Sequence, residues 1–201
     1  MRSSPPSRVA VGSSCWRQAL SPSPTEQRYI LKELVERNYF DFALGFLSKS
    51  FAARQVSLPL LAFIKAVFVE NTKPEKAVIA AFTSDAAFLK HVGVHFTWRE
   101  ETGNVQQLVY MQSRPELPWG VPFYCPNPHC TGTQSDVNPR MKKTEPQYLL
   151  SCKACRMKTV GYIKHPPWIS VINKFVYCHP ATIDGVEAAR SLIGRVPMEE
   201  M

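Results

Sequence analysis

The sequence has no apolar run long enough to cross a membrane. Its longest run, Val56–Val69, has 14 residues and contains Lys65, whereas a spanning helix needs about 20 mostly apolar residues. The N-terminus also lacks the apolar core of a secretory signal peptide. We therefore expect an intracellular protein without a membrane partner, located in the nucleus if the organism is eukaryotic.

Catalytic motifs are missing as well. The chain contains no H-E-x-x-H, no G-x-S-x-G, no Walker motif and no dinucleotide fingerprint. Cys178 and His179 could supply a nucleophile and a base, but adjacent residues on a strand point to opposite faces. We therefore do not expect an enzyme.

Acidic residues are absent from residues 1–24, which contain three arginines, seven serines and four prolines. Because this segment shows no apolar periodicity, it predicts a disordered tail. Arginine and serine without acids are also typical of mitochondrial transit peptides, so a mitochondrial location stays open.

Residues 25–92 show apolar positions at helical spacing and predict a small helical bundle. The first helix is expected to begin at Ser23, with Glu26 closing a capping box, and to continue through Leu47. A second helix is expected from Ser57 to Glu70. It is apolar on almost all sides, which predicts burial between other helices.

Two shorter helices are expected to complete the bundle. Thr72 and Glu75 form a capping-box pattern ahead of the third helix, and Ser84 can begin a fourth that Gly93 ends. Packing within the core is the simplest role of these helices. The amphipathic first helix also offers a surface for a protein partner.

The pattern becomes β-like after residue 92. The runs His95–Arg99 and Val105–Tyr110 flank Gly103-Asn104 and predict a β-hairpin. Seven prolines between residues 115 and 146 exclude long helices there, so residues 93–120 are expected to form a hairpin and a linker. A short helix is expected at residues 184–192, within a C-terminal segment 181–201.

Four of the six cysteines form two close pairs. Cys125 and Cys130 are followed, after 21 residues, by Cys152 and Cys155. Each pair supplies two thiolates from one turn, and the spacer brings the pairs together, as a tetrahedral zinc site requires. His129 could replace Cys130 as a ligand. We favour Cys130, because neighbouring residues cannot easily both point at one ion.

Four thiolates would fill the coordination sphere of Zn²⁺ and leave no position for a reacting water. The expected cofactor is therefore a structural zinc ion. Cys152 and Cys155 alone also match a C-x-x-C redox motif. Such motifs usually begin a helix in a βαβ unit, and the flanking segments here are proline-rich and β-prone.

The segment Tyr148-Leu-Leu-Ser-Cys152-Lys-Ala-Cys155 resembles the second half of a zinc ribbon. The segment Cys125-Pro-Asn-Pro-His-Cys130-Thr-Gly132 resembles its first knuckle, although ribbons mostly use a spacing of two residues there. The order of the parts is similar to ribbons of transposases and transcription factors. The resemblance covers residues 121–165 and implies a β-rich zinc-ribbon-like module, expected to span residues 121–180.

The net charge of +8 is concentrated around this module. Residues 125–165 carry seven basic and two acidic residues, and a clustered basic surface suits a polyanion. We expect this surface to bind nucleic acid, with DNA as the first candidate, because basic side chains neutralise phosphates. A solvated surface is the alternative. The candidate phosphate-binding residues are Arg140, Lys142, Lys143, Lys153, Arg156, Lys158 and Lys164.

Aromatic residues are interleaved with the basic residues of this module. Tyr148, Tyr162 and Trp168 could stack on bases in a single strand. We favour a core role for them, because a small module needs every apolar side chain.

The sequence thus predicts an α+β protein in which a small N-terminal helical bundle precedes a β-rich zinc ribbon. The preferred function is zinc-dependent binding of nucleic acid. Two alternatives stay open: a protein-interaction adaptor whose partner docks on the helical part, and a non-catalytic fragment of a mobile-element protein.

Overall fold

The computed structural model describes most of the chain between residues 24 and 181, together with two short strands outside that span. The described residues are 9–12, 24–47, 53–84, 86–114, 117–121, 123–125, 127, 129–142, 145, 147–173, 176–181 and 198–200. The helix predicted at residues 184–192 and the cap predicted at Ser23 lie outside them. Within the segment predicted to be disordered, residues 9–12 form a strand.

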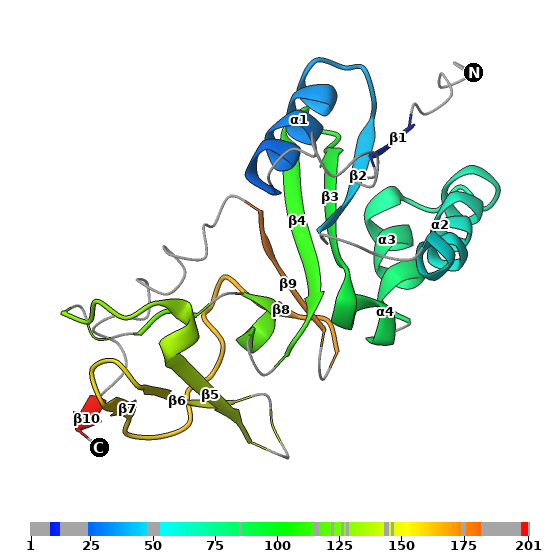
Figure 1. The fold of residues 1–201 in the computed structure, drawn as a ribbon. Coiled ribbons are helices and arrows are strands. Elements are labelled where there is room, and N and C mark those ends of the chain that lie inside the picture. Colours follow the sequence, from blue (N-terminus) through cyan, green and yellow to red (C-terminus); the bar gives the residue numbers. More distant parts are fainter. Residues whose placement is uncertain are drawn as a thin grey trace. The chain divides into compact units, whose positions relative to one another are not determined.

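The chain divides into two compact units, residues 1–110 and 111–201. Helices come first and a β-rich region follows, which confirms the α+β class (Figure 1). Within the described part of the chain, no helix combines the length and the apolar character needed to cross a bilayer. The finer division into five segments stays a prediction.

The first unit combines helices with a sheet whose strands are distant in sequence. Its elements are β1 (Val9–Gly12), α1 (Pro24–Glu36), β2 (Phe42–Leu47), α2 (Ala53–Phe68), α3 (Pro74–Thr83), α4 (Ala86–His91), β3 (Gly93–Arg99) and β4 (Val105–Gln112).

The strands β1 to β4 lie side by side in sequence order. β1 is parallel to β2, whereas β2–β3 and β3–β4 are antiparallel. The predicted hairpin of β3 and β4 is therefore confirmed. Gly103, in its turn, has a positive φ of 89°, a conformation that glycine adopts without steric cost.

Side chains of β2 alternate between the two faces of the sheet, and different helices cover each face (Figure 1). Ala43 packs with Leu31 and Val35 of α1 on one face. Phe42 and Phe46 point to the other face, where they contact aromatic rings of α2, α3 and α4. Those rings belong to Phe63, Phe82 and Phe88.

The first helix ends earlier than its apolar pattern predicted. Asn38 has a φ of 58°, and the Tyr39 N–H donates to the carbonyl oxygen of Leu34 at 3.1 Å. This is a Schellman-type helix end, for which asparagine is a suitable residue. Phe42–Leu47 is then a strand, and its buried faces on both sides explain why it has no polar alternation.

The prediction of a helical bundle is therefore wrong for residues 25–92, because the helices pack on a sheet. The prediction that the second helix is buried on all sides is also wrong. In α2, Leu58 and Leu61 are 75% and 64% exposed. The third helix has Lys73 as its N-cap without a side-chain hydrogen bond, so the predicted capping box does not form.

The second unit contains short strands, two 3₁₀ turns and no α-helix among its described residues. Its elements are η1 (Pro118–Gly120), η2 (Gln134–Asp136), β5 (Val137–Met141), β6 (Tyr148–Cys152), β7 (Met157–Thr159), β8 (Ser170–Val171), β9 (Val176–Pro180) and β10 (Met198–Glu200).

One sheet of this unit has the order β10-β7-β6-β5, and all its neighbouring strands are antiparallel. β8 and β9 form a further antiparallel pair. β9 contains Cys178 and His179 on successive positions, and the His179 ring lies 3.1 Å from the Pro180 carbonyl oxygen through Nδ1.

Aromatic side chains form the core of this unit. Trp119 is fully buried and packs edge-on against Phe123 and Tyr148, with ring centroids 5.2 and 5.0 Å away. Leu150 and Tyr177 belong to the same buried cluster. This core supports β6 from behind and so positions the end of the strand, where Cys152 lies.

Candidate metal centre

The first cysteine pair lies in the loop that follows the aromatic core. The Cys130 N–H donates to the carbonyl oxygen of Asn127 at 3.1 Å, and the His129 N–H donates to Asn127 Oδ1 at 3.0 Å. Asparagine commonly closes a turn in this way. The turn brings both Cys125 and Cys130 to one side of the loop.

The second pair is set by the end of β6. Cys152 is the last residue of the strand, and a turn carries the chain to Cys155. Arg156 then adopts a φ of 56° before β7 begins. A left-handed residue at this point redirects the chain after Cys155, and β7 then returns antiparallel to β6.

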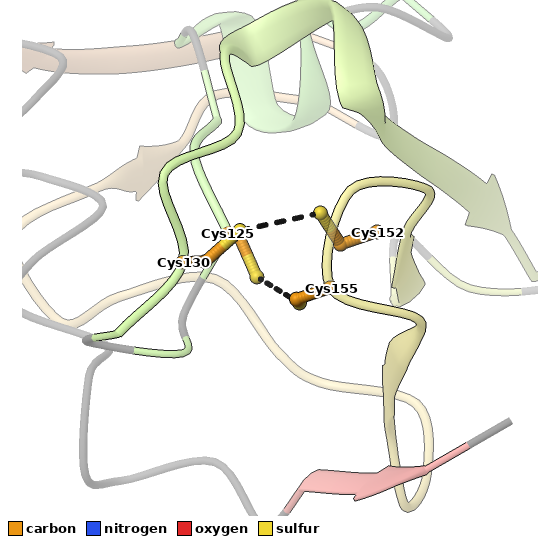
Figure 2. Close-up of side chains that lie close together, drawn as sticks. All are labelled: Cys125, Cys130, Cys152 and Cys155. Atoms are coloured by element: carbon orange, nitrogen blue, oxygen red, sulfur yellow. Dashed lines mark hydrogen bonds between the residues drawn. The ribbon is translucent and has the colours of Figure 1, made fainter.

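The four sulfur atoms converge, as the spacing predicted. Cys125 Sγ lies 3.5 Å from Cys155 Sγ, and Cys130 Sγ lies 3.6 Å from Cys152 Sγ. All four lie within 4.8 Å of one another, with the side chains turned inward (Figure 2). Sulfurs around a tetrahedral zinc ion are about 3.8 Å apart, given a Zn–S bond of about 2.3 Å.

These separations are far longer than the bond of a disulfide, about 2.05 Å, and the four cysteines are free thiols. The cluster contains Cys130, whereas His129 is exposed and lies outside it. The donor set therefore fits a metal ion with four thiolate ligands. Both sulfur contacts, Cys125–Cys155 and Cys130–Cys152, cross between the pairs, so the site joins two segments of chain.

Backbone N–H groups point at three of the sulfurs, each from two residues further along. The donors are Asn127 for Cys125, Gly132 for Cys130 and Met157 for Cys155. The Gly132 N–H lies 3.3 Å from its sulfur. Such donors stabilise a thiolate relative to a thiol, which suits ligands that bind metal in the deprotonated form.

Burial opposes these donors at the first pair. It raises the pKa of the Cys125 thiol well above its usual range, and it raises the pKa of Cys130. At Cys155 burial acts in the same direction, but the Met157 N–H and the neighbouring thiols outweigh it, and the pKa of Cys155 is lowered. Of Cys125, Cys130 and Cys155, only Cys155 therefore has a thiol pKa below the usual value.

Hydrogen bonds around the cluster connect the two pairs. The Lys153 N–H donates to the carbonyl oxygen of Asp136 at 2.9 Å. Asp136 also accepts from the Thr133 N–H at 2.7 Å and from the Thr133 hydroxyl at 2.9 Å, and these bonds lower the pKa of its carboxyl. This support was not predicted from the sequence, although Thr133 and Asp136 have the T-x-x-D spacing of a capping box.

The seven predicted nucleic-acid residues lie at different places in the second unit: two on its sheet, two in the second cysteine turn, and three elsewhere in the sequence. Arg140 on β5 and Lys158 on β7 lie on the sheet, where register pairs them with Leu149 and Ser151 of β6. Lys153 and Arg156 are exposed in the second cysteine turn. Of the remaining three, Lys142 follows β5, Lys164 is exposed after β7, and Lys143 lies outside the described residues.

The face of the sheet that holds Arg140 is the one that points away from the core. Along β6, Tyr148, Leu150 and Cys152 are buried, whereas the alternate residues are half-buried. Arg140, Lys142 and Lys158 share the side of Leu149 and Ser151 by strand alternation. Lys142 also forms an ion pair of 3.4 Å with Glu145.

The aromatic residues of the module are mostly structural. Tyr148 is buried in the core, and Trp168 packs against that core. Tyr162, by contrast, is 48% exposed. The expectation of a core role is therefore met for the first two residues and not for the third.

Searches against family models, curated proteins and solved structures found no match to this chain. The fold and the site define it as an α+β protein with a four-cysteine cluster that could hold a metal ion.

Proposed function

We propose that residues 121–180 form a zinc ribbon in which Cys125, Cys130, Cys152 and Cys155 bind one structural Zn²⁺. The convergence of the four sulfurs supports this most directly. The antiparallel strands β5, β6 and β7, with the second cysteine pair between β6 and β7, are the arrangement expected of a ribbon. Zinc would hold the fold, since thiolates fill its coordination sphere.

Four thiolates also suit iron, so the metal must be identified directly. Elemental analysis of protein purified without added metal is expected to find one zinc per chain. A Cys152→Ser variant should lose it, because a hydroxyl is a poor replacement for a thiolate ligand. A protein that carries iron, or that carries no metal, would contradict the proposal.

We further propose that the ribbon binds nucleic acid, with DNA as the first candidate. Arg140 and Lys158 support this, because they lie on the outer face of the sheet at positions that strand register defines. Lys142 extends the same side, and exposed Tyr162 lies shortly after β7. Basic groups and an exposed ring are what a phosphate backbone and an unpaired base require.

Lys153 and Arg156 have a second possible role. Zn²⁺ with four thiolates carries a net charge of about −2, and cations in the adjacent turn would offset it. We therefore assign phosphate contacts first to Arg140, Lys142 and Lys158. Lys153 and Arg156, in the turn, serve both roles.

Fluorescence anisotropy with single-stranded and double-stranded oligonucleotides tests this assignment. Affinity should fall steeply with salt, because phosphate binding releases counterions. An Arg140→Gln/Lys158→Gln variant should weaken binding and reduce the salt slope by about 1.4–1.8, the value for two phosphate contacts. The matched control is Lys32→Gln/Lys76→Gln, which removes the same charge from the first unit. Equal losses in both variants would contradict a specific basic face.

A protein-interaction adaptor is the second candidate, and one observation favours it. Several large apolar side chains of α2 are exposed in the described part of the first unit: Leu58, Leu61, Ile64 and Phe68. Exposed apolar patches of this kind mark protein interfaces. A nucleic-acid affinity that is absent or insensitive to salt would favour the adaptor.

A further inference from the structure

The C-terminal strand β10 adds to the ribbon sheet at the edge of β7 (Figure 1). Three residue pairs define the register, and Glu199 occupies the position directly opposite Lys158. The strand is acidic, with the sequence Met198-Glu199-Glu200. An acidic segment from the end of the chain therefore lies against a strand that carries one of the proposed phosphate-binding residues.

Register extends this relationship across the whole sheet. Asn138 pairs with Ser151, Ser151 with Lys158, and Lys158 with Glu199. Residues directly opposite each other in antiparallel strands share a face of the sheet. These four paired residues form one row across the sheet, so the register position of Glu199 lies on the same face as Lys158. Arg140 lies on that face too, because it is two residues after Asn138 along β5.

We propose that β10 is a built-in competitor of nucleic acid, which lowers the affinity of the basic ribbon face because an acidic residue, Glu199, occupies the register position opposite Lys158. This inference rests on the proposed nucleic-acid function of that face. A negatively charged residue type at the register position opposite Lys158 lowers the local positive potential and disfavours a phosphate that approaches this face. Nucleic acid binds most tightly when the charge of β10 is removed or the strand leaves the edge of β7.

The three-residue ladder makes such displacement feasible. Each backbone hydrogen bond makes only a modest net contribution to stability, so a strand of three residue pairs is weakly bound to the edge of β7. The sheet keeps β5, β6 and β7 when β10 leaves, because those strands pair with one another. Control of affinity then requires no rearrangement around the cysteine cluster.

Three forms of the full chain test this proposal: wild type, Glu199→Gln/Glu200→Gln, and a truncation that ends at residue 197. Each is titrated into a fluorescein-labelled oligothymidine of about 20 nucleotides at several salt concentrations. Both altered forms should bind about three to ten times more tightly than wild type at low salt. The glutamine variant keeps the strand, so it reports on charge if the truncation fails to fold.

Two controls make the result specific. Glu33→Gln/Glu36→Gln changes net charge equally in α1 and should leave the affinity unchanged. In a Lys158→Gln background, removing the charge of β10 should have a much smaller effect, because the two groups act on each other. Metal content, measured for every form, confirms that the cysteine cluster is intact.

The outcomes separate this inference from the proposed function. If all forms bind the oligonucleotide with the same affinity, β10 is no competitor and the proposed function stands. If no form binds at low salt, the proposed function fails and this inference fails with it. An equal gain in the Glu33→Gln/Glu36→Gln control would show a general charge effect and overturn the role of β10.

Discussion

A Cβ atom added at Gly132 would lie 2.7 Å from the Cβ atom of Ala154. The two residues belong to different cysteine turns, and contacts this short do not occur between real side chains. Cys130 Sγ would also lie only 3.2 Å from the added atom. The close approach of the turns, and with it the convergence of the sulfurs, therefore requires glycine at position 132.

Replacement of Gly132 should damage the metal centre. Gly132→Ala is expected to destabilise the second unit by about 1–3 kcal/mol, as overpacking typically does, and to weaken metal binding. A chelator competition assay and thermal unfolding measure the two effects. Gly161→Ala is the matched control, because nothing lies within 4 Å of a Cβ atom at that position. Equal effects of the two substitutions would contradict the close-packing argument.

Removal of the metal should unfold the ribbon and spare the first unit. Metal binding can contribute on the order of 10 kcal/mol to the folding of a small module, whereas the first unit has a core of its own. Circular dichroism with and without a chelator should show loss of β signal and retention of helix signal. A Cys178→Ala variant, altered outside the cluster, should keep its metal and should lose β signal on chelation as the wild type does. An unchanged β signal after chelation would exclude a structural role for the metal.

Alkaline pH should destabilise the second unit through its buried tyrosines. Burial raises the pKa of Tyr148 and of Tyr177 above the usual value, which is about 10 for tyrosine. The folded state therefore keeps protons that the unfolded state loses, and stability falls as pH rises beyond about 10. Absorbance at the tyrosinate band should show a late component that coincides with unfolding. Tyr148→Phe should reduce that component, and an unchanged titration curve would contradict the assignment.

The end of α1 should depend on the residue at position 38. Asn38 has a φ of 58°, which costs a β-branched residue about 1–2 kcal/mol. Asn38→Val should lower the free energy of unfolding by that amount, whereas Asn38→Gly should leave it nearly unchanged. Chemical denaturation of both variants, followed by the helix signal, measures the difference. Similar stabilities for valine and glycine would show that the left-handed conformation is not required.

Local patterns in the sequence were sufficient to predict several elements of secondary structure. The third and fourth helices and the β3–β4 hairpin follow from short-range signals, since spacing and turn residues lie within the element itself. The extent of the first helix was misread, because apolar residues buried on both faces of β2 show no alternation. The sequence signal for the end of this helix was the residue type at position 38, because asparagine tolerates the left-handed conformation that ends a helix.

The sequence alone determined that two pairs of thiols would each come from one turn, because four or two intervening residues close a turn without help from the rest of the chain. Only the tertiary structure decided how the pairs meet, which face of α2 is exposed, and where β10 pairs. Those relationships join residues far apart along the chain, and they depend on packing and strand register that no local pattern encodes.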